Sequence, residues 1–215
     1  RRVPEVIDVW FDSGSMTYAR HHYPFENQEK LKSTYPAEYI SEGDDQLRLW
    51  FYTMFVLGVA LFDSTPFLNV IVIGMLGDEK GKKMSKSSGN YPPIEEVFND
   101  WGADMLRYFL LKSGVAKAEA TAFSYKALEE TKKEFFTMLW NSYRYFLTYA
   151  EVNNFEPTDN SSSDILDKWI LDQLNQLVIS MNNKFKDYEV MLATRELAPF
   201  VNNLSTWYIR RSRDR

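Results

Sequence analysis

A cationic, hydroxyl-rich segment, "GDEKGKKMSKSSGN" at residues 77–90, is the part of the sequence best suited to bind a charged ligand. It follows the apolar run "FLNVIVIGM" at 67–75, and it is too rich in glycine, serine and lysine to be core or a regular helix. Lys83 and Lys86 can bind phosphates as point charges, and the neighbouring serines can donate hydrogen bonds. A flexible cationic loop can thus neutralise the charge that builds up in phosphoryl or nucleotidyl transfer. For lysine-rich loops in general, a solvated surface loop is the commoner explanation.

The elements that must position this loop have an α/β pattern. "EVIDVWF" (5–11) alternates and is rich in β-branched residues, which predicts a strand. "AEYIS" (37–41) predicts a second strand, and an apolar helix follows it, N-capped by Asp44 and reaching about Phe62. The continuous apolar run "PFLNVIVIGM" (66–75) is typical of a parallel strand covered on both faces. Strand, helix and strand in this order indicate a βαβ unit.

Polar residues follow each of the three expected strands. They are "DSGS" at 12–15, "EGDDQ" at 42–46 and the lysine-rich segment at 77–90. Ligands bind open α/β sheets beyond the carboxyl ends of the strands. The three clusters are therefore expected to converge on one site.

The second half of the chain has helical periodicity. After two short helices in "PPIEEVFNDWG" and "ADMLRYFLLK", apolar residues recur at spacings of three, four and seven from Ser124 onward. A polar linker at 153–163 separates this first long helix from two more, which start near Ile165 and Val190. The predicted fold class is therefore α/β followed by all-α.

Composition narrows the classes of protein. The 45% hydrophobic and 16% aromatic content excludes a disordered chain, and no apolar run reaches the roughly 20 residues of a membrane span. The absence of cysteine excludes disulfides and thiolate metal sites, and two adjacent histidines, His21 and His22, do not suit an all-histidine site. We therefore expect a soluble, intracellular protein without a protein-bound metal.

The net charge of −5 argues against nucleic acid binding over the whole surface. The arginines at 210–215 still allow a local basic site at that end of the sequence.

The string "KMSKS" at Lys83–Ser87 resembles the signature of class I aminoacyl-tRNA synthetases. Together with four further strings, it makes essentially the whole chain resemble the isoleucyl-tRNA synthetase family. The four strings are "DVWFDSG" at 8–14, "EGDDQLRLW" at 42–50, "GADMLRYFLL" at 102–111 and "WYIRRSRDR" at 207–215. The resemblance implies the second half of a Rossmann-type catalytic domain, followed by a helical connecting region and an anticodon-binding region.

The family pattern also implies domain boundaries. Residues 1–115 would be the C-terminal half of the catalytic domain with the lysine loop, 116–152 the connecting helical region, and 153–215 the start of the anticodon-binding helical domain. The family's H-I-G-H element and inserted editing domain have no counterpart in the sequence. We therefore expect an internal segment of a longer, monomeric enzyme. The isolated segment is expected to be inactive and, because its sheet would have an exposed edge, to self-associate.

The resemblance assigns roles to particular residues. Trp10 and Trp50 would form walls of the amino-acid pocket, with Gln46 beside them. Lys83, Ser85 and Lys86 would be the catalytic residues of the loop. The residues implied to bind ATP or the aminoacyl-adenylate are Glu42, Gly43, Asp45, Gln46, Lys83, Met84, Ser85, Lys86 and Ser87.

The implied activity is a cytoplasmic ligation. Isoleucine would be activated with ATP, supplied as its Mg²⁺ complex, and then transferred to tRNA(Ile). Leu49 stands where the family commonly has glycine, so the resemblance does not define the detailed shape of the amino-acid pocket. The alternatives are a valyl- or leucyl-type synthetase, a noncatalytic RNA-binding relative, or an unrelated nucleotide-binding module.

Overall fold

The structure, a computed structural model, describes residues 2–158 and 162–214. Its residue contacts divide the chain into two compact units, which we describe in turn. The first unit comprises Arg1–Met75 with Lys117–Glu119, and the second comprises Leu76–Ala116 with Ala120–Arg215.

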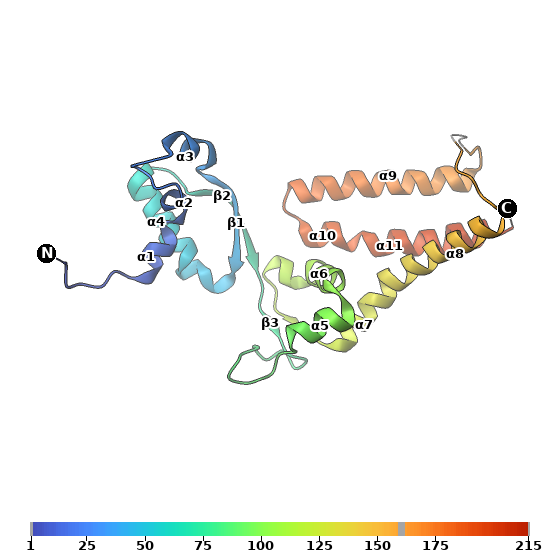
Figure 1. Cartoon of the computed structure of the whole chain (residues 1–215), viewed down its shortest axis with the longest axis horizontal. Coiled ribbons are helices and arrows are strands. Elements are labelled where there is room, and N and C mark those ends of the chain that lie inside the picture. The colour runs from blue at the N-terminus through green and yellow to red at the C-terminus, as the bar shows by residue number, and fades with distance from the viewer. Residues whose placement is uncertain (1, 159–161, 215) are drawn as a thin grey trace. The chain divides into compact units, whose positions relative to one another are not determined.

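The first unit is built on two parallel strands. β1 (Ala37–Gly43) and β2 (Phe67–Ile73) pair along their whole lengths, with Gly43 opposite Ile73. Helix α4 (Trp50–Phe62) connects them, as Figure 1 shows. Ile40, Phe51 and Met54 form the buried core between the strands and this helix. The predicted parallel strand–helix–strand unit is confirmed.

The predicted strand at 5–11 is wrong. Residues 9–14 form helix α1 (Val9–Gly14), which starts where the Asp8 carboxylate accepts a hydrogen bond from the Trp10 N–H at 2.8 Å. The alternating apolar residues have no partner strand within the described residues, and Val6 remains 94% exposed. Two short helices, α2 (Met16–Ala19) and α3 (Gln28–Thr34), follow before β1.

Asp44 is not the N-cap of the apolar helix. It begins a separate 3₁₀ segment, η1 (Asp44–Arg48), whose N-cap is Gly43. Leu49 interrupts the helical geometry with φ −122° and ψ −106°, so α4 begins at Trp50. Because Leu68 on β2 is 62% exposed, the described residues also do not cover both faces of that strand, contrary to the prediction.

The second unit begins with a short strand pair and a helical core. β3 (Leu76–Gly77) pairs in parallel with β4 (Thr121–Ala122). The two predicted short helices are confirmed as α5 (Ile94–Trp101), which starts after Pro93, and α6 (Ala103–Lys112). The buried side chains of this core are Val97, Met105, Phe109, Phe123 and Leu128.

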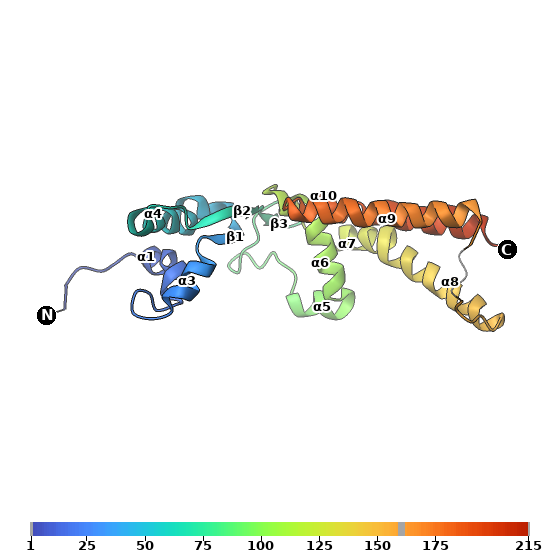
Figure 2. The ribbon, with the colours of Figure 1, turned by 90° about the horizontal axis from the view of Figure 1, so that it is seen from above.

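The three long helical runs are confirmed in the second unit. Ser124 accepts a hydrogen bond from the Ala127 N–H at 3.1 Å and so caps the first run. After the second run the chain turns back, and the third run lies alongside it in Figures 1 and 2. Part of the predicted linker, 159–161, lies outside the described residues. The elements are α7 (Tyr125–Thr131), a π-helical segment η3 (Lys132–Thr137) and α8 (Met138–Val152); α9 (Ile165–Lys186); and α10 (Val190–Arg195), α11 (Leu197–Asn202) and a π-helical segment η4 (Asn203–Ile209).

The order of elements confirms an α/β part followed by helices. Within the second unit, the Arg195 guanidinium donates a hydrogen bond from Nε to the Lys112 carbonyl at 2.8 Å. This bond ties α10, at the start of the third helical run, to the end of α6. In the part of the chain that the structure describes, no helix is long and apolar enough to cross a membrane.

Tyr108 offers a stability test of this core. Its side chain is 6% exposed, its hydroxyl has no hydrogen-bond partner among the described residues, and burial raises its pKa to about 12. We expect Tyr108→Phe to stabilise the chain by about 1 kcal/mol, because an unpaired buried hydroxyl is removed. Since the pKa is raised in the folded state, the wild type should lose stability as the pH rises from 10 towards 12. Chemical denaturation at pH 8 and pH 11 measures both effects. If the free energy of unfolding of Tyr108→Phe fell between these two pH values by as much as that of the wild type, Tyr108 would not be the group responsible for the loss.

Candidate functional site

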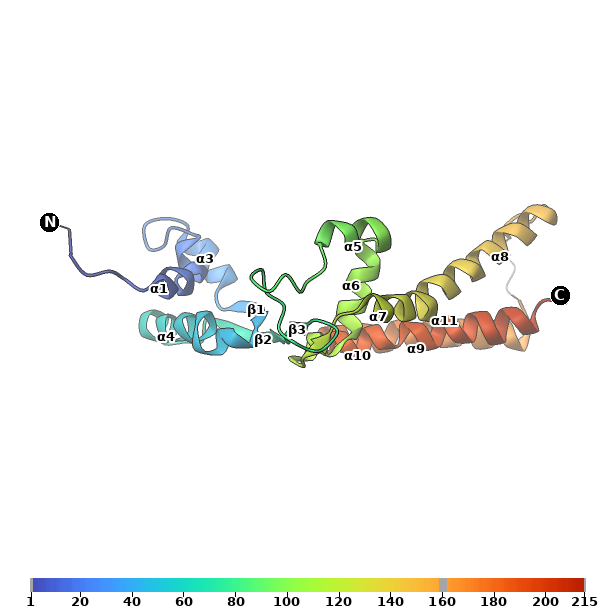
Figure 3. The same cartoon turned by 90° about the horizontal axis from the view of Figure 1, so that it is seen from below.

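The lysine loop lies in the second unit, between β3 and α5, where Figure 3 shows it as an irregular segment. Gly77 at the end of β3 forms an antiparallel bridge with Lys83, and the Asp78 N–H donates to the Lys82 carbonyl at 2.8 Å. The loop therefore starts with a tight turn. Gly81, at φ +76°, occupies a backbone region that favours glycine.

The signature residues form a turn closed by serine hydroxyls. The Ser85 hydroxyl lies 2.8 Å from the Ser88 hydroxyl and 3.2 Å from the Ser87 hydroxyl, and it accepts the Ser88 N–H at 3.2 Å. Gly89, at φ +57°, ends the turn. The hydroxyls are already partners of one another, which holds the segment compact around Lys86.

Lys83 and Lys86 are both exposed, and neither ammonium forms an ion pair within the described residues. Met84, between Lys83 and Ser85, is half-buried and packs against the core cluster of the second unit. Met84 thus anchors the loop through its side chain while the two lysines stay accessible to a ligand.

Asp78 and Asn90 were missed at the sequence level. Asp78 Oδ1 accepts the N–H groups of Lys80 and Lys82 at 3.0 and 2.9 Å, and Asp78 Oδ2 accepts the Asn90 amide at 2.9 Å. The Asn90 amide, followed by the Lys82 N–H, holds the pKa of Asp78 below its ordinary value of 3.8. The stability that the ionised Asp78 carboxylate contributes through these bonds is therefore present at neutral pH and is lost as the pH falls below 3.8 towards the folded-state pKa. The sequence feature that could have indicated this bond is the position of two short polar residues, Asp78 and Asn90, at the two ends of the loop.

In the first unit, Trp50 joins α4 to α1. Its indole N–H donates to the Ser13 carbonyl at 3.0 Å. Gly14 allows this approach, because a Cβ there would lie 2.9 Å from the Thr53 hydroxyl and 3.0 Å from the Met54 nitrogen. Trp10 is half-buried on α1. The two predicted pocket tryptophans therefore stand on two helices that pack together.

The predicted adenylate-binding residues lie at the carboxyl end of β1 and in η1. Glu42 is exposed and accepts the Gly43 N–H at 3.1 Å. A side chain at Gly43 would meet Asp45 Oδ1 at 2.8 Å, so glycine lets the Asp45 carboxylate approach the strand end. Gln46 Oε1 accepts the Trp50 N–H at 3.2 Å and so links this segment to α4. Carboxylates placed in this way can accept hydrogen bonds from ribose hydroxyls.

One premise of the predicted convergence of three polar clusters is wrong, because the first cluster does not follow a strand. "DSGS" at 12–15 follows no strand, because its first three residues lie in α1 and Ser15 caps that helix. The 42–46 cluster is at the end of β1, as predicted. The lysine loop belongs to the other unit, so its meeting with the other two clusters stays a prediction.

His21 has a structural role and His22 is on the surface. The His21 ring is 6% exposed, lies 3.0 Å from the Thr34 hydroxyl and accepts the Arg20 Nε–H at 3.1 Å. Burial, followed by the charges of Arg20 and Lys30, lowers the His21 pKa. His22 is exposed.

The C-terminal arginines are stacked on aromatic rings. The Arg211 guanidinium lies 4.2 Å from the Trp207 ring centre, and that of Arg213 lies 5.6 Å from the Tyr145 ring centre. Stacking of this kind orients a guanidinium without neutralising it. Contact between these arginines and RNA stays a prediction.

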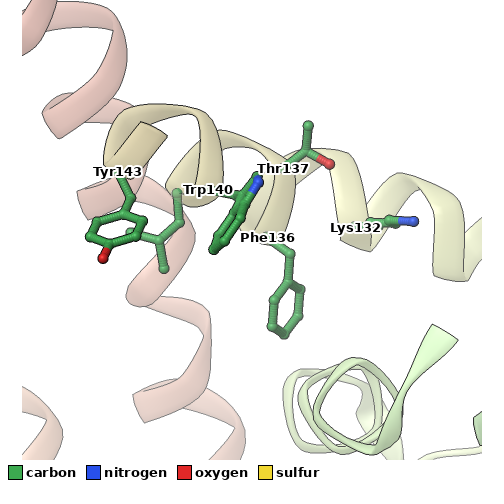
Figure 4. A pocket seen from close by; sticks show the side chains of 6 residues that line it. Lys132, Phe136, Thr137, Trp140 and Tyr143 are labelled. Carbon is green, nitrogen blue, oxygen red and sulfur yellow. The ribbon is translucent and has the colours of Figure 1, made fainter. Parts of the chain in front are cut away.

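A separate cavity of about 620 Å³ lies in the second unit along η3 and α8 (Figure 4). Its lining is mainly aromatic and aliphatic and includes Phe136, Trp140 and Tyr143. None of the predicted site residues line it. It is therefore distinct from the lysine loop.

Family models match both parts of the chain. Residues 1–122 match tRNA synthetases class I (I, L, M and V), and residues 167–215 match the anticodon-binding domain of tRNA ligase. Since the first match covers more than half of the sequence, the chain belongs to the family of class I tRNA synthetases (I, L, M and V).

Curated proteins similar to this chain include isoleucine–tRNA ligases. Those of Protochlamydia amoebophila, Clostridium tetani and Chlamydia trachomatis are 44%, 43% and 45% identical to it, and each match covers 100% of this chain. The chain spans about a fifth of the length of these relatives, 21% in each case.

Solved structures show the same fold. A LeuRS of Agrobacterium radiobacter, in a ternary complex with tRNA and LeuAMS, matches with a TM-score of 0.78 and 18% identity over 98% of this chain and 28% of its own. The methionyl-tRNA synthetase of Mycobacterium tuberculosis bound by methionyl-adenylate matches with a TM-score of 0.77 and 19% identity, over 99% of this chain and 42% of its own. The predicted class I fold, α/β and then helical, is thereby confirmed.

Proposed function

We propose that the chain is the segment of an isoleucine-specific aminoacyl-tRNA synthetase that carries the lysine loop and part of the amino-acid pocket. The observation that carries the proposal is the identity of 43–45% to isoleucine–tRNA ligases along the whole chain. The accessible lysines of the loop fit the chemistry, since they have no competing ion pair within the described residues.

The proposed reaction has two steps. A carboxylate oxygen of isoleucine attacks the α-phosphorus of ATP, the bond to the β-phosphate oxygen breaks, and isoleucyl-adenylate and pyrophosphate form. Lys83 and Lys86 stabilise the negative charge that develops on the phosphates, and Mg²⁺ arrives with ATP as part of the substrate. A terminal ribose hydroxyl of tRNA(Ile) then attacks the isoleucyl carbonyl, and AMP leaves.

The first unit supplies the adenylate and amino-acid contacts in this proposal. Glu42 and Asp45 accept hydrogen bonds from the ribose, and the close approach at Gly43 keeps the Asp45 carboxylate at the strand end. Trp10 and Trp50 form walls of the side-chain pocket, with Gln46 beside Trp50. In the loop, Ser85 and Ser87 hold the turn around Lys86, and Met84 anchors it.

The proposal also includes domain boundaries, a cellular location and an oligomeric state. The catalytic part would end at 115, the connecting helices at 152, and the anticodon-binding part would begin at 153. The longer enzyme would be cytoplasmic and monomeric. Selectivity against valine depends on one methylene, which contributes only about 1–3 kcal/mol, so a separate editing site would be required.

Complementation tests the proposal. In the isoleucine–tRNA ligase of Clostridium tetani, residues 1–215 of this chain replace the segment that they match. This chimaeric enzyme should restore growth to a strain whose own isoleucine–tRNA ligase is inactivated, and it should charge tRNA(Ile) in vitro. A folded chimaera that charges tRNA with valine or leucine in preference to isoleucine would favour the valyl- or leucyl-type alternative. A folded chimaera that binds tRNA and charges nothing would favour the noncatalytic relative.

A further inference from the structure

Asn90 uses the full hydrogen-bonding capacity of its side-chain N–H groups inside the lysine loop. Its Nδ2 donates to Asp78 Oδ2 at 2.9 Å and to the Lys83 carbonyl at 3.2 Å, and its Oδ1 accepts the Ser85 N–H at 3.0 Å. Asn90 is half-buried, so these bonds are partly screened from water. A single side chain thus binds the backbone on both sides of Met84.

Asp78 connects this amide to the end of a strand. It directly follows β3, and its other carboxylate oxygen accepts the two N–H groups of the tight turn, from Lys80 and Lys82. The turn is close-packed at Gly77, where a Cβ would lie 2.9 Å from backbone atoms of Gly81. The carboxylate is therefore fixed by the backbone, and Asn90 is fixed by the carboxylate.

The backbone of Lys83–Ser85 is consequently held from two directions. The Met84 side chain packs into the core cluster, and the Asn90 amide binds the carbonyl of Lys83 and the N–H of Ser85. Lys83 and Lys86 remain exposed at the two edges of this fixed segment. Charge stabilisation depends on donors that are in place before the reaction, because a misplacement of about 1 Å can cost 10²-fold in rate.

We propose that Asp78 and Asn90, together called the amide clamp, are positioning residues that set the lysine loop for adenylate formation. They act through the backbone of Lys83–Ser85 and do not themselves touch the substrate. This inference rests on the proposed function for its effect on rate, but the clamp itself is a property of the loop and can be measured without catalysis.

The test is a reciprocal exchange in the chimaeric enzyme. Asn90→Asp removes both amide donors and sets two carboxylates against each other, and Asp78→Asn sets two amides against each other. We expect Asn90→Asp to lower kcat for isoleucine-dependent ATP–pyrophosphate exchange by about 10–100-fold per active site, with KM for isoleucine changed less than about threefold. In Asp78→Asn/Asn90→Asp the amide at 78 can donate to the carboxylate at 90, so kcat should recover at least about threefold relative to Asn90→Asp.

Glu79→Gln is the matched control, because Glu79 is exposed in the same turn and should leave kcat unchanged. If kcat of the double variant is no higher than the value obtained by multiplying the fold losses of the two single variants, the clamp is overturned. A wild-type kcat in Asn90→Asp would overturn it as well. Hydrogen–deuterium exchange of peptide 78–90 gives a second readout: exchange should accelerate in Asn90→Asp and slow again in the double variant. If the unaltered chimaera has no isoleucine-dependent exchange, the proposed function fails, and the deuterium measurement alone then decides on the clamp.

Discussion

Lys86→Ala is expected to slow isoleucyl-adenylate formation in the chimaeric enzyme by about 10²–10³-fold. The lysine is exposed in a turn that the serine hydroxyls hold compact, so its charge is available to the phosphates of ATP. Because it would interact with charge that develops during the reaction, the equilibrium binding of isoleucine should change by less than about threefold. Rapid-quench single-turnover measurements give the rate, and calorimetry gives the isoleucine affinity.

Lys80→Ala is the control for this prediction. Lys80 is an exposed lysine of the same loop, and its backbone N–H, which the substitution leaves in place, makes its hydrogen bond to Asp78. Its loss should change the rate by less than about threefold. Equal losses in rate for Lys80→Ala and Lys86→Ala would reduce the loop to a general attraction for anions. An equal loss of isoleucine affinity would remove the transition-state role of Lys86.

Trp50→Ala is expected to destabilise the chain by about 3 kcal/mol and to raise KM for isoleucine in the chimaera by at least about tenfold. The substitution removes the half-buried indole and its hydrogen bond to the Ser13 carbonyl, which joins α4 to α1. Trp50→Phe, which loses the hydrogen bond but keeps a ring, should cost only about 1 kcal/mol. Urea unfolding followed by circular dichroism measures the stabilities.

Trp140→Ala provides the matched control on α8, where the tryptophan is 58% exposed. Its effect on stability should stay within about 0.5 kcal/mol, with KM for isoleucine unchanged. If Trp50→Ala lowered stability and left KM unchanged, Trp50 would be a packing residue only. The role of its ring as a wall of the isoleucine pocket would then be wrong.

The sequence predicted the elements whose pattern reflects their own burial. The helix at 103–112 matches α6 to the residue, because its apolar positions coincide with packing inside the chain. The strand in 66–75 matches β2 through its run of β-branched residues, although Leu68 is 62% exposed. At 5–11 the same reasoning failed. An alternating pattern does not reveal whether a partner strand is present. The described residues provide no partner strand for 5–11, and the Asp8 side chain caps helix α1 instead.

The site was only partly predictable for a similar reason. The lysines and serines of the loop were readable as a contiguous string, whereas the packing of Met84 against the core cluster is visible only in the structure. The bond between Asp78 and Asn90 joins residues twelve positions apart through an irregular loop, and no periodicity encodes it. Close approaches such as that of Gly14 to α4 likewise depend on tertiary packing.

The most direct test of the central claim is ATP–pyrophosphate exchange by the chimaeric enzyme with each of the twenty amino acids in turn. We expect isoleucine to give the highest kcat/KM, with valine lower by about 10–200-fold, as a difference of one methylene allows. Lys83→Ala/Lys86→Ala in the same enzyme should abolish the isoleucine-dependent signal. Exchange driven best by another amino acid, in an enzyme that retains its fold, would contradict the assignment of this chain to an isoleucine-specific synthetase.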